Sequence, residues 1–338
     1  LPSNQSPLGA LPARFRRPRL LVVGCGDVGL RVLRELPAAA GLKPGPQMRV
    51  LALTSSAERV AVLRAQGATP LLANLDDAHS LRRLAGLAQR VLHLAPPLGT
   101  GPTDPRTRNL LHALRLRSAP LALVYGSTSG VYGNHHGALV RETSTLHSAT
   151  PRALRRIDAE RNVRWWGRSS LGGGQPVRIS ILRIPGIYAG DRADGTPQGR
   201  LRKGTPVLAA HDDVFTNHIH ADDLARACIA ALWRGKLQRT VNVNDDTRLK
   251  MGDYFDWAAD LYGLPRPPRI TREAAQTQLP AMQLSFMGES RQMDNTRLKR
   301  ELRLRLRYPT VVQGLQIDCL HSVVYCAGRP VQAGSTSL

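Results

Sequence analysis

The stretch Leu20-Leu-Val-Val-Gly24-Cys-Gly26-Asp-Val-Gly29 decides the fold of this chain. Its apolar first half predicts a buried strand, and the Gly-x-Gly-x-x-Gly spacing that follows predicts a tight turn opening a helix. Gly24 permits the turn, Gly26 lets a pyrophosphate approach the backbone, and Gly29 lets the helix pack closely on the strand. The motif therefore favours a dinucleotide, with its anion at the helix N-terminus, over an ordinary tight turn. The loop residues expected at the cofactor are Gly24, Cys25, Gly26, Asp27, Val28 and Gly29.

Outward from this loop, short apolar runs alternate with longer amphipathic segments. Strands are expected at 20–23, 49–54, 69–73, 90–95, 121–125, 177–183 and 240–243, and helices near 28–36, 57–66, 77–88, 105–117, 152–166 and 221–233. Strands this apolar are typical of a parallel sheet that is covered on both faces and joined by right-handed crossovers. The sequence therefore predicts the α/β class, with a Rossmann-type doubly wound parallel sheet.

The strand pattern fades after residue 244, where helices are expected near 251–261 and 294–303 on either side of the Pro-rich segment 264–268. This change indicates a second, smaller unit over the carboxyl edge of the sheet. The expected regions are a disordered arm at 1–18, a nucleotide-binding domain at 19–244 with cap insertions near 190–217, a mainly helical substrate-binding cap at 245–325, and a tail at 326–338.

The amino-acid composition is that of a globular protein and excludes several other classes. With 338 residues, 42% of them hydrophobic and 21% charged, the chain is globular, and no apolar run is long enough for a membrane span or a signal peptide. Four isolated cysteines without a C-x-x-C pair favour a reducing cytoplasm. The net charge of +22 comes almost entirely from arginines spread over the whole length, which argues against a nucleic-acid stripe. We favour an interpretation in which these arginines simply cover the surface, over one in which their positive charge attracts an anionic ligand or polymer.

The second predicted strand ends in Leu53-Thr54-Ser55-Ser56-Ala57-Glu58-Arg59. An NAD-specific site usually presents an acid to the ribose 2′-hydroxyl at such a strand tip, and none stands here. Three hydroxyls with the guanidinium of Arg59 suit a 2′-phosphate, because arginine donors match phosphate oxygens. The sequence therefore favours NADP over NAD. The alternative is that Ser-x-x-Glu is a capping box followed by an exposed helical arginine.

Further motifs follow in order along the chain. They are Asn74-Leu75-Asp76-Asp77, His93-Leu94-Ala95-Pro96, Ser127-Thr128-Ser129-Gly130-Val131-Tyr132-Gly133, residues 183–190, and Ile219-His220-Ala221-Asp222-Asp223-Leu224. Joined to the glycine-rich loop, this series resembles the extended short-chain dehydrogenase/reductases, in the branch of NAD-dependent epimerase/dehydratase-like proteins, from about residue 19 to 318. The resemblance implies hydride transfer on a small or sugar-like metabolite, and it allows a homodimer.

The resemblance also implies individual roles. Asn74 takes the place of an aspartate that contacts adenine, and its amide oxygen can accept from the adenine amino group. Thr128 falls on the Ser/Thr that polarises the substrate, unless the hydroxyl run merely closes a strand. The segment from Leu94 passes the cofactor's ribose. The residues expected at the cofactor beyond those already named are Leu75, Leu94, Ala95, Pro96, Ser127, Arg156 and Pro185.

The chain departs from the family at its catalytic pair, Tyr-x-x-x-Lys on the helix after the fifth strand. That helix reads Pro151-Arg152-Ala-Leu-Arg155-Arg156-Ile-Asp158-Ala159-Glu160, and counting back from its Ala-Glu pair puts Arg152 at the Tyr position and Arg156 at the Lys position. A guanidinium stays protonated, so neither replaces the tyrosine as acid or base. Arg156 can still hold the nicotinamide ribose. Arg152 can bind a carboxylate or phosphate of a substrate, or remain an exposed helical arginine.

An enzyme without that pair needs another acid or base, for which Thr128, Tyr132, Tyr188 and water are the candidates. The rival hypothesis is a non-catalytic NADP(H) sensor or partner-binding protein, which the missing pair supports. Retention of Thr128, Arg183, Tyr188 and His220 supports a working cleft.

Two histidine pairs, His135-His136 and His218-x-His220, raise the question of a metal. No Cys or carboxylate pattern at ligand spacing completes either pair, so no metal site is expected. His220 is expected to pack beneath the cleft, and Asp222 to cap the helix that follows.

Overall fold

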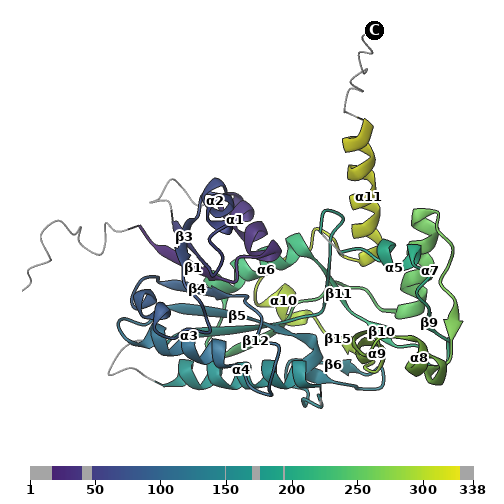
Figure 1. Ribbon diagram of the computed structural model, residues 1–338, viewed down its shortest axis with the longest axis horizontal. Helices are drawn as coiled ribbons and strands as arrows, with labels where there is room; N and C mark the ends of the chain where they lie inside the picture. Colours follow the sequence, from purple (N-terminus) through teal and green to yellow (C-terminus); the bar gives the residue numbers. More distant parts are fainter. Residues whose placement is uncertain (1–16, 40–47, 149, 170–175, 193–194, 328–338) are drawn as a thin grey trace, which may run out of the picture.

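The computed structural model describes residues 17–39, 48–148, 150–169, 176–192 and 195–327; the expected arm before residue 17 and the tail after residue 327 lie outside this range. The largest element is a seven-stranded parallel sheet in the order β12-β7-β5-β4-β1-β2-β3 (Figure 1). Its strands are β1 (Arg19–Val23), β2 (Arg49–Thr54), β3 (Thr69–Leu72), β4 (Arg90–His93), β5 (Ala122–Thr128), β7 (Arg178–Ile184) and β12 (Arg239–Asn242). This order confirms the doubly wound α/β prediction and places the switch point between β1 and β4.

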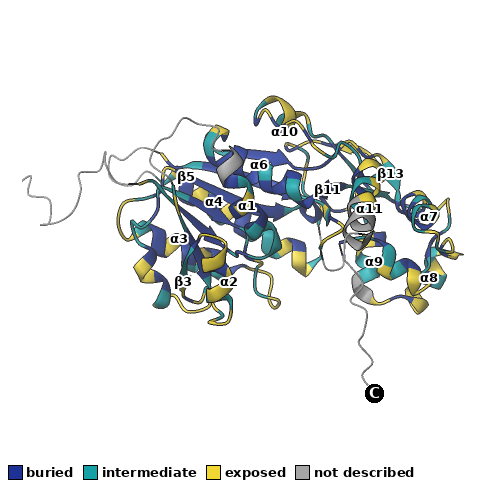
Figure 2. Ribbon diagram, turned by 90° about the horizontal axis from the view of Figure 1, so that it is seen from above, coloured by how far each residue is buried: buried dark blue, intermediate teal, exposed yellow. Residues whose placement is uncertain are grey.

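Alternate residues of the central strands supply two separate cores. In β1, Leu20 and Val22 face α1, α2 and α6, whereas Leu21 and Val23 face η2, α3 and α4. These helices are α1 (Asp27–Ala39), α2 (Arg59–Ala65), η2 (Ser80–Leu84), α3 (Pro105–Arg115), α4 (Pro151–Arg168) and α6 (Ala221–Arg234). Figure 2 shows the buried strands lying between the two helical layers. Burial on both faces explains why the strands read as apolar runs.

One predicted helix, at 77–88, is wrong: only the 3₁₀ turn η2 forms there. The polar side chains before it hydrogen-bond to the local backbone instead. Asn74 Oδ1 accepts from the Asp76 N–H at 3.0 Å, Asp77 Oδ1 accepts from the His79 N–H at 2.9 Å, and Ser80 Oγ donates to the Asp77 carbonyl at 2.8 Å. Such bonds offer the chain an alternative to the helical ladder, so a regular helix does not propagate.

A second apolar cluster lies beyond the carboxyl edge of the sheet, and it draws residues from Tyr188 to Leu315. Its helices are α5 (Gln198–Arg202), α7 (Met251–Tyr262), α8 (Arg272–Gln278), α9 (Ala281–Met287) and α11 (Val311–Ala327). Short strand pairs tie this region together: β8 (Gly186–Tyr188) with β11 (His218–His220), β9 (Val207–Leu208) with β14 (Arg269–Ile270), and β10 (Phe215–Thr216) with β13 (Leu249–Lys250). Figure 1 shows α11 leaving the body of the protein.

The segment after this cluster returns to the sheet. The helix α10 (Thr296–Arg300) packs against β12, and Leu298, Leu302 and Leu306 join the core on the α1 and α6 face. The expected placement of a 294–303 helix in the cap is therefore wrong, because its apolar side chains are buried against the sheet. Just before it, β15 (Gln292–Met293) pairs with β6 (Leu139–Val140) and brings residues 289–293 beside the end of β5.

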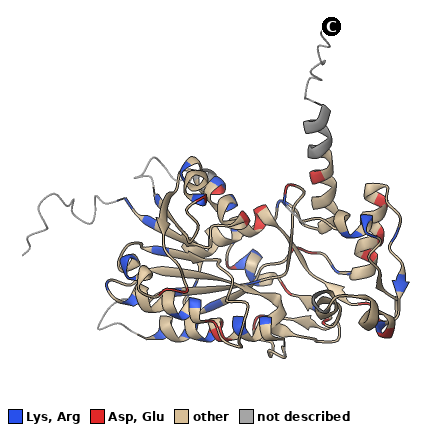
Figure 3. Cartoon of the chain, viewed as in Figure 1, with Lys and Arg blue, Asp and Glu red and all other residues tan. Residues whose placement is uncertain are grey.

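Basic side chains do not gather in one stripe. Figure 3 shows Lys and Arg distributed over helices on both sides of the sheet and over the second cluster. Within the described residues, no helix is long and apolar enough to cross a membrane.

Candidate functional site

The glycine-rich loop has the geometry that its sequence predicts. Gly24 has φ +83°, and a Cβ there would lie 2.3 Å from the backbone nitrogen of Ala95. A Cβ on Gly29 would lie 3.2 Å from Cys25 Sγ. A Cβ on Gly26, in contrast, meets no atom within 4 Å. The loop thus leaves an open stretch of backbone at Gly26 between two tightly packed glycines, which is the cradle that a pyrophosphate requires.

The ends of β1 and β4 are held together at this loop. The N–H groups of Leu94 and Ala95 both donate to the carbonyl of Val23, at 2.7 and 3.1 Å. These bonds explain why Gly24 tolerates no side chain, because the backbone after β4 crosses directly over it. The segment from Leu94 therefore lies next to the pyrophosphate cradle.

Asp27 stands at the first turn of α1, where its charge would oppose a bound pyrophosphate. It is neutralised by two arginines, Arg31 at 3.2 Å and Arg192 at 3.4 Å. Arg31 is almost fully buried and also pairs with Asp191 and Asp222. This cluster joins α1 to the segment after β8 and to the start of α6, so the cradle is anchored to both.

The tip of β2 is tied to the same loop by Arg59, whose guanidinium donates to the carbonyl of Cys25 at 2.7 Å. Thr54 Oγ1 accepts from the Ser56 N–H at 3.2 Å, and Ser55 is exposed. The hydroxyls and the guanidinium named from the sequence therefore lie together at the end of β2, beside the cradle.

The alternative reading of this segment as a capping box is not realised. The helix α2 begins at Arg59, and its N-cap residue is Glu58, which has helical backbone angles and makes no side-chain capping bond. Ser55 therefore does not cap α2, which leaves its hydroxyl uncommitted to that helix.

The loops after β3 and β4 are bridged by one arginine. Arg106 of α3 donates to both carboxylate oxygens of Asp76, at 2.8 and 2.6 Å, and to the carbonyl of Pro96 at 3.4 Å. The hydrogen bond from Arg106 lowers the pKa of Asp76. Asn74 is exposed, with its amide oxygen held by the Asp76 N–H. The loop after β3 is thus held in place by its own hydrogen bonds and by Arg106 of α3.

Three other residues expected at the cofactor are half-buried. Val28 packs against the core on the α1 face and Leu75 against the core on the α3 face. Pro185 lies between β7 and β8. The side chains of Val28 and Leu75 are shared with the core, so a cofactor contact would use only part of their surface.

At the end of β5, the neighbouring residues Ser127 and Thr128 differ in the surroundings of their hydroxyls. Ser127 is buried and donates to Glu160 at 2.7 Å, while Glu160 also binds Arg183 at 2.8 Å in a buried ion pair. The Ser127 hydroxyl is therefore committed to the core. Thr128 is half-buried, and its Oγ1 accepts from the Gly130 N–H at 3.2 Å. Its own O–H remains able to donate to a ligand oxygen.

Arg152 and Arg156, which the sequence predicts at the family's Tyr and Lys positions, lie on the side of α4 that meets the end of β5 and α9, a place that we call the cleft. Arg156 donates to the carbonyl of Gly126 at 2.8 Å and to the Tyr125 hydroxyl at 3.0 Å, which fixes it at the end of β5. Arg152 is exposed and stacks on Phe286 of α9, with its guanidinium carbon 4.5 Å from the ring centre. Arg152 thus reaches from the sheet side of the cleft to the cap.

Neither tyrosine that the sequence offered as a proton donor faces the cleft. Tyr132 is fully buried and donates to Asn242 Oδ1 at 2.6 Å, and burial raises its pKa. Tyr188 is also buried and donates to the Thr310 carbonyl at 3.3 Å; burial, followed by the charge of Asp245, raises its pKa. The structure therefore argues against both as acids, because each hydroxyl is sealed in a core and already bonded.

Sequence reasoning gave no role to His93, although its motif was noticed. His93 is buried at the end of β4, and its Nε2 lies 2.9 Å from the hydroxyl of Thr107, which donates to Asp104 at 2.6 Å. Burial, assisted by the charge of Arg156, lowers the pKa of His93 to about 3. A neutral imidazole therefore supports the floor beneath Arg156.

Arg291 was also missed, because no local motif marks it. It is buried just before β15, where it donates to the Gly133 carbonyl at 2.8 Å and to Ser129 Oγ at 3.4 Å, and pairs with Glu289 at 2.8 Å. Only the pairing of β15 with β6 brings it to the end of β5.

The histidines of β11 are core residues. His220 stacks on Tyr308 with ring centres 3.6 Å apart, and its Nδ1 accepts from the Asp222 N–H at 3.1 Å. The expected cap of α6 is thus corrected: His220, not Asp222, caps the helix. His218 packs on Tyr254 at 4.6 Å, and burial lowers its pKa to about 4.

Comparison with known proteins agrees with this architecture. A model of the NAD dependent epimerase/dehydratase family matches residues 21–244. No curated protein matches the chain in sequence. Among solved structures, a functionally unknown conserved protein from Silicibacter pomeroyi DSS is 28% identical, over 90% of this chain and 99% of that one, with a TM-score of 0.71.

Two further structures share the fold at lower identity. The UDP-glucose 4-epimerase of Thermotoga maritima, solved with UDP-glucose, is 17% identical over 91% of this chain and 99% of its own, with a TM-score of 0.71. MoeE5, solved with UDP-glucose and NAD, is 19% identical over 90% of this chain and 99% of its own, with a TM-score of 0.68.

The cradle makes a direct prediction. Gly26→Val places a branched side chain in the open space above the loop, so we expect loss of dinucleotide binding with the fold retained. A ligand at 100 times its dissociation constant stabilises a protein by about 2.7 kcal/mol, and NADPH should raise the melting temperature of the parent but not of the variant. Gly99→Val, in an exposed loop with equally open space, is the control. A thermal shift that survives in Gly26→Val would reduce the loop to an ordinary turn.

The buried imidazole makes a second prediction. Between pH 6.5 and about 3 the unfolded chain binds a proton at His93 that the folded chain does not, so acidification favours unfolding. Between pH 7.5 and 5.5 this difference costs the parent about 1.4 kcal/mol of unfolding free energy. In urea titrations at both values, His93→Gln should lose correspondingly less stability than the parent. The exposed His112→Gln is the control; equal pH dependence in His93→Gln and the parent would contradict the account.

Proposed function

Because the chain belongs to the NAD dependent epimerase/dehydratase family, we propose that it is an NADP(H)-dependent oxidoreductase acting on a small or sugar-like metabolite. The observation that carries the proposal is the glycine loop, whose backbone is open at Gly26 and bonded to Arg59 through the carbonyl of Cys25. The substrate would enter between the end of β5, the α4 arginines and the cap.

The preference for NADP rests on charge at the tip of β2. No carboxylate lies between Leu53 and Ala57, where an acid would hold a free ribose hydroxyl and repel a phosphate. Arg59 spends one N–H on the Cys25 carbonyl and keeps its other donors. The bond holds the guanidinium beside the loop, so less entropy is lost when it binds a 2′-phosphate.

The nicotinamide would give or take a hydride at a carbonyl or alcohol carbon. On the protein side, the Thr128 O–H would donate to the reacting oxygen and orient it beside the cofactor. Arg156, fixed by two hydrogen bonds at the end of β5, would hold the nicotinamide ribose. With Tyr132 and Tyr188 sealed in cores, water is the proton source that this geometry leaves open.

The rival function is a non-catalytic NADP(H) sensor. Two observations favour it. Arginines stand where the resemblance expects the family's Tyr-Lys pair. Tyr132 and Tyr188, the tyrosines considered as proton donors, are buried, and their hydroxyls are already hydrogen-bonded. A sensor requires the cofactor cradle but no proton donor. Both the oxidoreductase and the sensor are expected to bind NADP(H). Only the oxidoreductase is expected to turn over a substrate, so a turnover measurement distinguishes them.

The first test concerns cofactor choice. By calorimetry, the parent should bind NADPH more tightly than NADH, and Arg59→Ala should lose about 1.5 to 3 kcal/mol of binding free energy for NADPH alone, because a charge-assisted hydrogen bond is lost. Arg64→Ala, an exposed arginine on the same helix, is the control. Equal affinity of the parent for both cofactors would sink the NADP assignment.

The second test concerns turnover. Single-turnover oxidation of bound NADPH is followed with a panel of aldehydes, ketones and nucleotide sugars. Thr128→Val should slow it by about 100-fold or more, the range of general acid–base assistance, whereas Thr128→Ser keeps the hydroxyl and most of the rate. If the parent binds NADPH firmly yet never oxidises it above the buffer rate, the sensor function replaces the oxidoreductase.

A further inference from the structure

The arginines at the family's Tyr and Lys positions form one charged face. Arg152 and Arg156 are four residues apart on α4, about 40° around the helix, so their side chains leave it in nearly the same direction. Arg161 lies nine residues from Arg152, about 180° away, and points from the opposite face. The helix therefore carries two guanidiniums into the cleft and keeps others outside it.

A third guanidinium approaches from the returning segment before β15. Arg291 is buried beneath Ser129, and its Nε has no hydrogen-bond partner among the described residues. Burial lowers the pKa of Arg291, the charge of Glu289 opposes this shift, and the positive charge of Arg152 adds to it. Arg152 and Arg291 carry like charges, which repel one another.

The arginines of this cleft differ in whether a carboxylate of the described residues neutralises them. Glu289 neutralises Arg291, and Glu160 neutralises Arg183. Arg152 and Arg156 have no carboxylate partner in the described part of the chain: one rests on the Phe286 ring, and the other on a carbonyl and a phenol. Arg31, Arg106 and Arg183, in contrast, each pair with a carboxylate of another element.

We propose that the ligand of this cleft carries an oxyanion, either a carboxylate or a phosphate group, that Arg152 binds where the family presents its tyrosine. Arg156 faces the cofactor side and adds its charge, and Phe286 holds the Arg152 fork in place from the cap. A guanidinium matches both kinds of anion through two parallel hydrogen bonds. This inference rests on the proposed function only for the location of the reacting group.

The proposal narrows the substrate class. A metabolite that carries its carbonyl or alcohol next to a carboxylate, or a sugar that carries a phosphate, would place the anion on Arg152 and the reacting oxygen near Thr128. The same fixed charges would stabilise negative charge that develops on that oxygen. A neutral sugar would leave the guanidiniums uncompensated.

Direct binding tests the proposal without turnover. Malonate, inorganic phosphate, glucose 6-phosphate and neutral glucose are titrated by calorimetry into the full chain, with and without saturating NADPH. The parent should bind at least one of the anions and not glucose, and Arg152→Gln should weaken that anion at least tenfold. The preferred probe, malonate or phosphate, identifies the kind of oxyanion.

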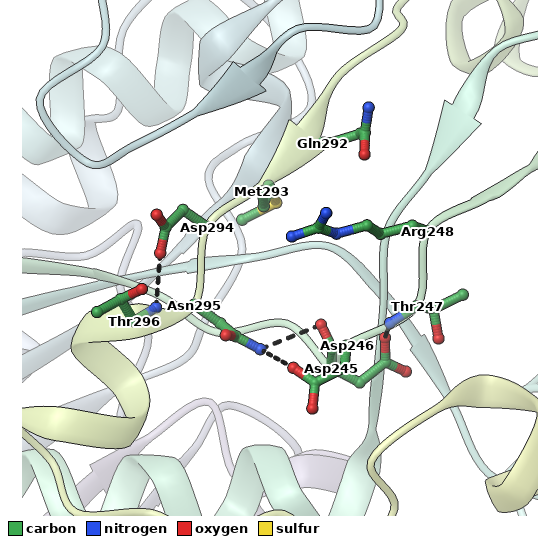
Figure 4. Close-up of a pocket in the computed structure, with 9 residues that line it drawn as sticks. All are labelled: Asp245, Asp246, Thr247, Arg248, Gln292, Met293, Asp294, Asn295 and Thr296. Carbon is green, nitrogen blue, oxygen red and sulfur yellow. Dashed lines mark hydrogen bonds between the residues drawn. The ribbon is translucent and has the colours of Figure 1, made fainter.

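Two charge-matched variants control for the general basicity of the chain. Arg161→Gln removes an exposed arginine from the opposite face of α4. Arg248→Gln removes one from a polar pocket of about 360 Å³ beyond β12, where Figure 4 shows its side chain among Gln292, Met293 and Asp294. Both should retain the anion affinity of the parent. Equal losses in a control and in Arg152→Gln, or no anion binding by the parent, would overturn the proposal.

The outcomes separate this inference from the proposed function. NADPH affinity is measured for every variant, so a general loss of the cofactor site is recognised. Anion binding that depends on Arg152 without oxidation of NADPH would keep the ligand class and reject hydride transfer. Oxidation of NADPH by neutral substrates alone, with no anion bound at Arg152, would keep hydride transfer and reject the ligand class.

Discussion

The buried pair between Glu160 of α4 and Arg183 of β7 is the interaction on which the rest of the site depends. Burying two charges is costly unless their remaining hydrogen-bond capacity is used, and here Glu160 also accepts from Ser127 while Arg183 reaches the Glu142 carbonyl. The pair therefore locks α4 against the ends of β5 and β7. Because Arg152 and Arg156 lie on that helix, the same lock sets where their guanidiniums enter the cleft.

The buried polar groups around Glu160 and Arg183 also explain which hydroxyls near the cleft are already hydrogen-bonded. Arg183 lies 4.7 Å from the ring centre of Tyr132, whose hydroxyl is bonded to Asn242, and Ser127 is drawn inward to Glu160. Thr128, one residue further along β5, is left outside. Alternation along a strand sends neighbouring side chains to opposite sides, so the Ser127 hydroxyl joins the core and the Thr128 hydroxyl lies outside it.

The described arginines differ in their partners. Arg31, Arg106 and Arg239 pair with carboxylates that belong to other elements and hold the fold together. Arg152 and Arg156 lie in the cleft on neutral groups. A net charge of +22 therefore includes arginines that hold elements of the fold together, which a count of basic residues does not separate from the others.

The sequence by itself determined the sheet and the cofactor cradle, because both rest on local rules: apolar runs of strand length, and glycines whose spacing matches a turn between strand and helix. It also singled out Thr128 by the hydroxyl run that follows the fifth strand, and Arg152 and Arg156 by counting back along one helix. Only the tertiary structure decided that Tyr132 and Tyr188 are sealed, that the helix near 294–303 packs on the sheet, and that Arg291 lies beneath Ser129. Each of these depends on contacts between residues far apart in the chain, whose burial and partners are set by how whole elements pack.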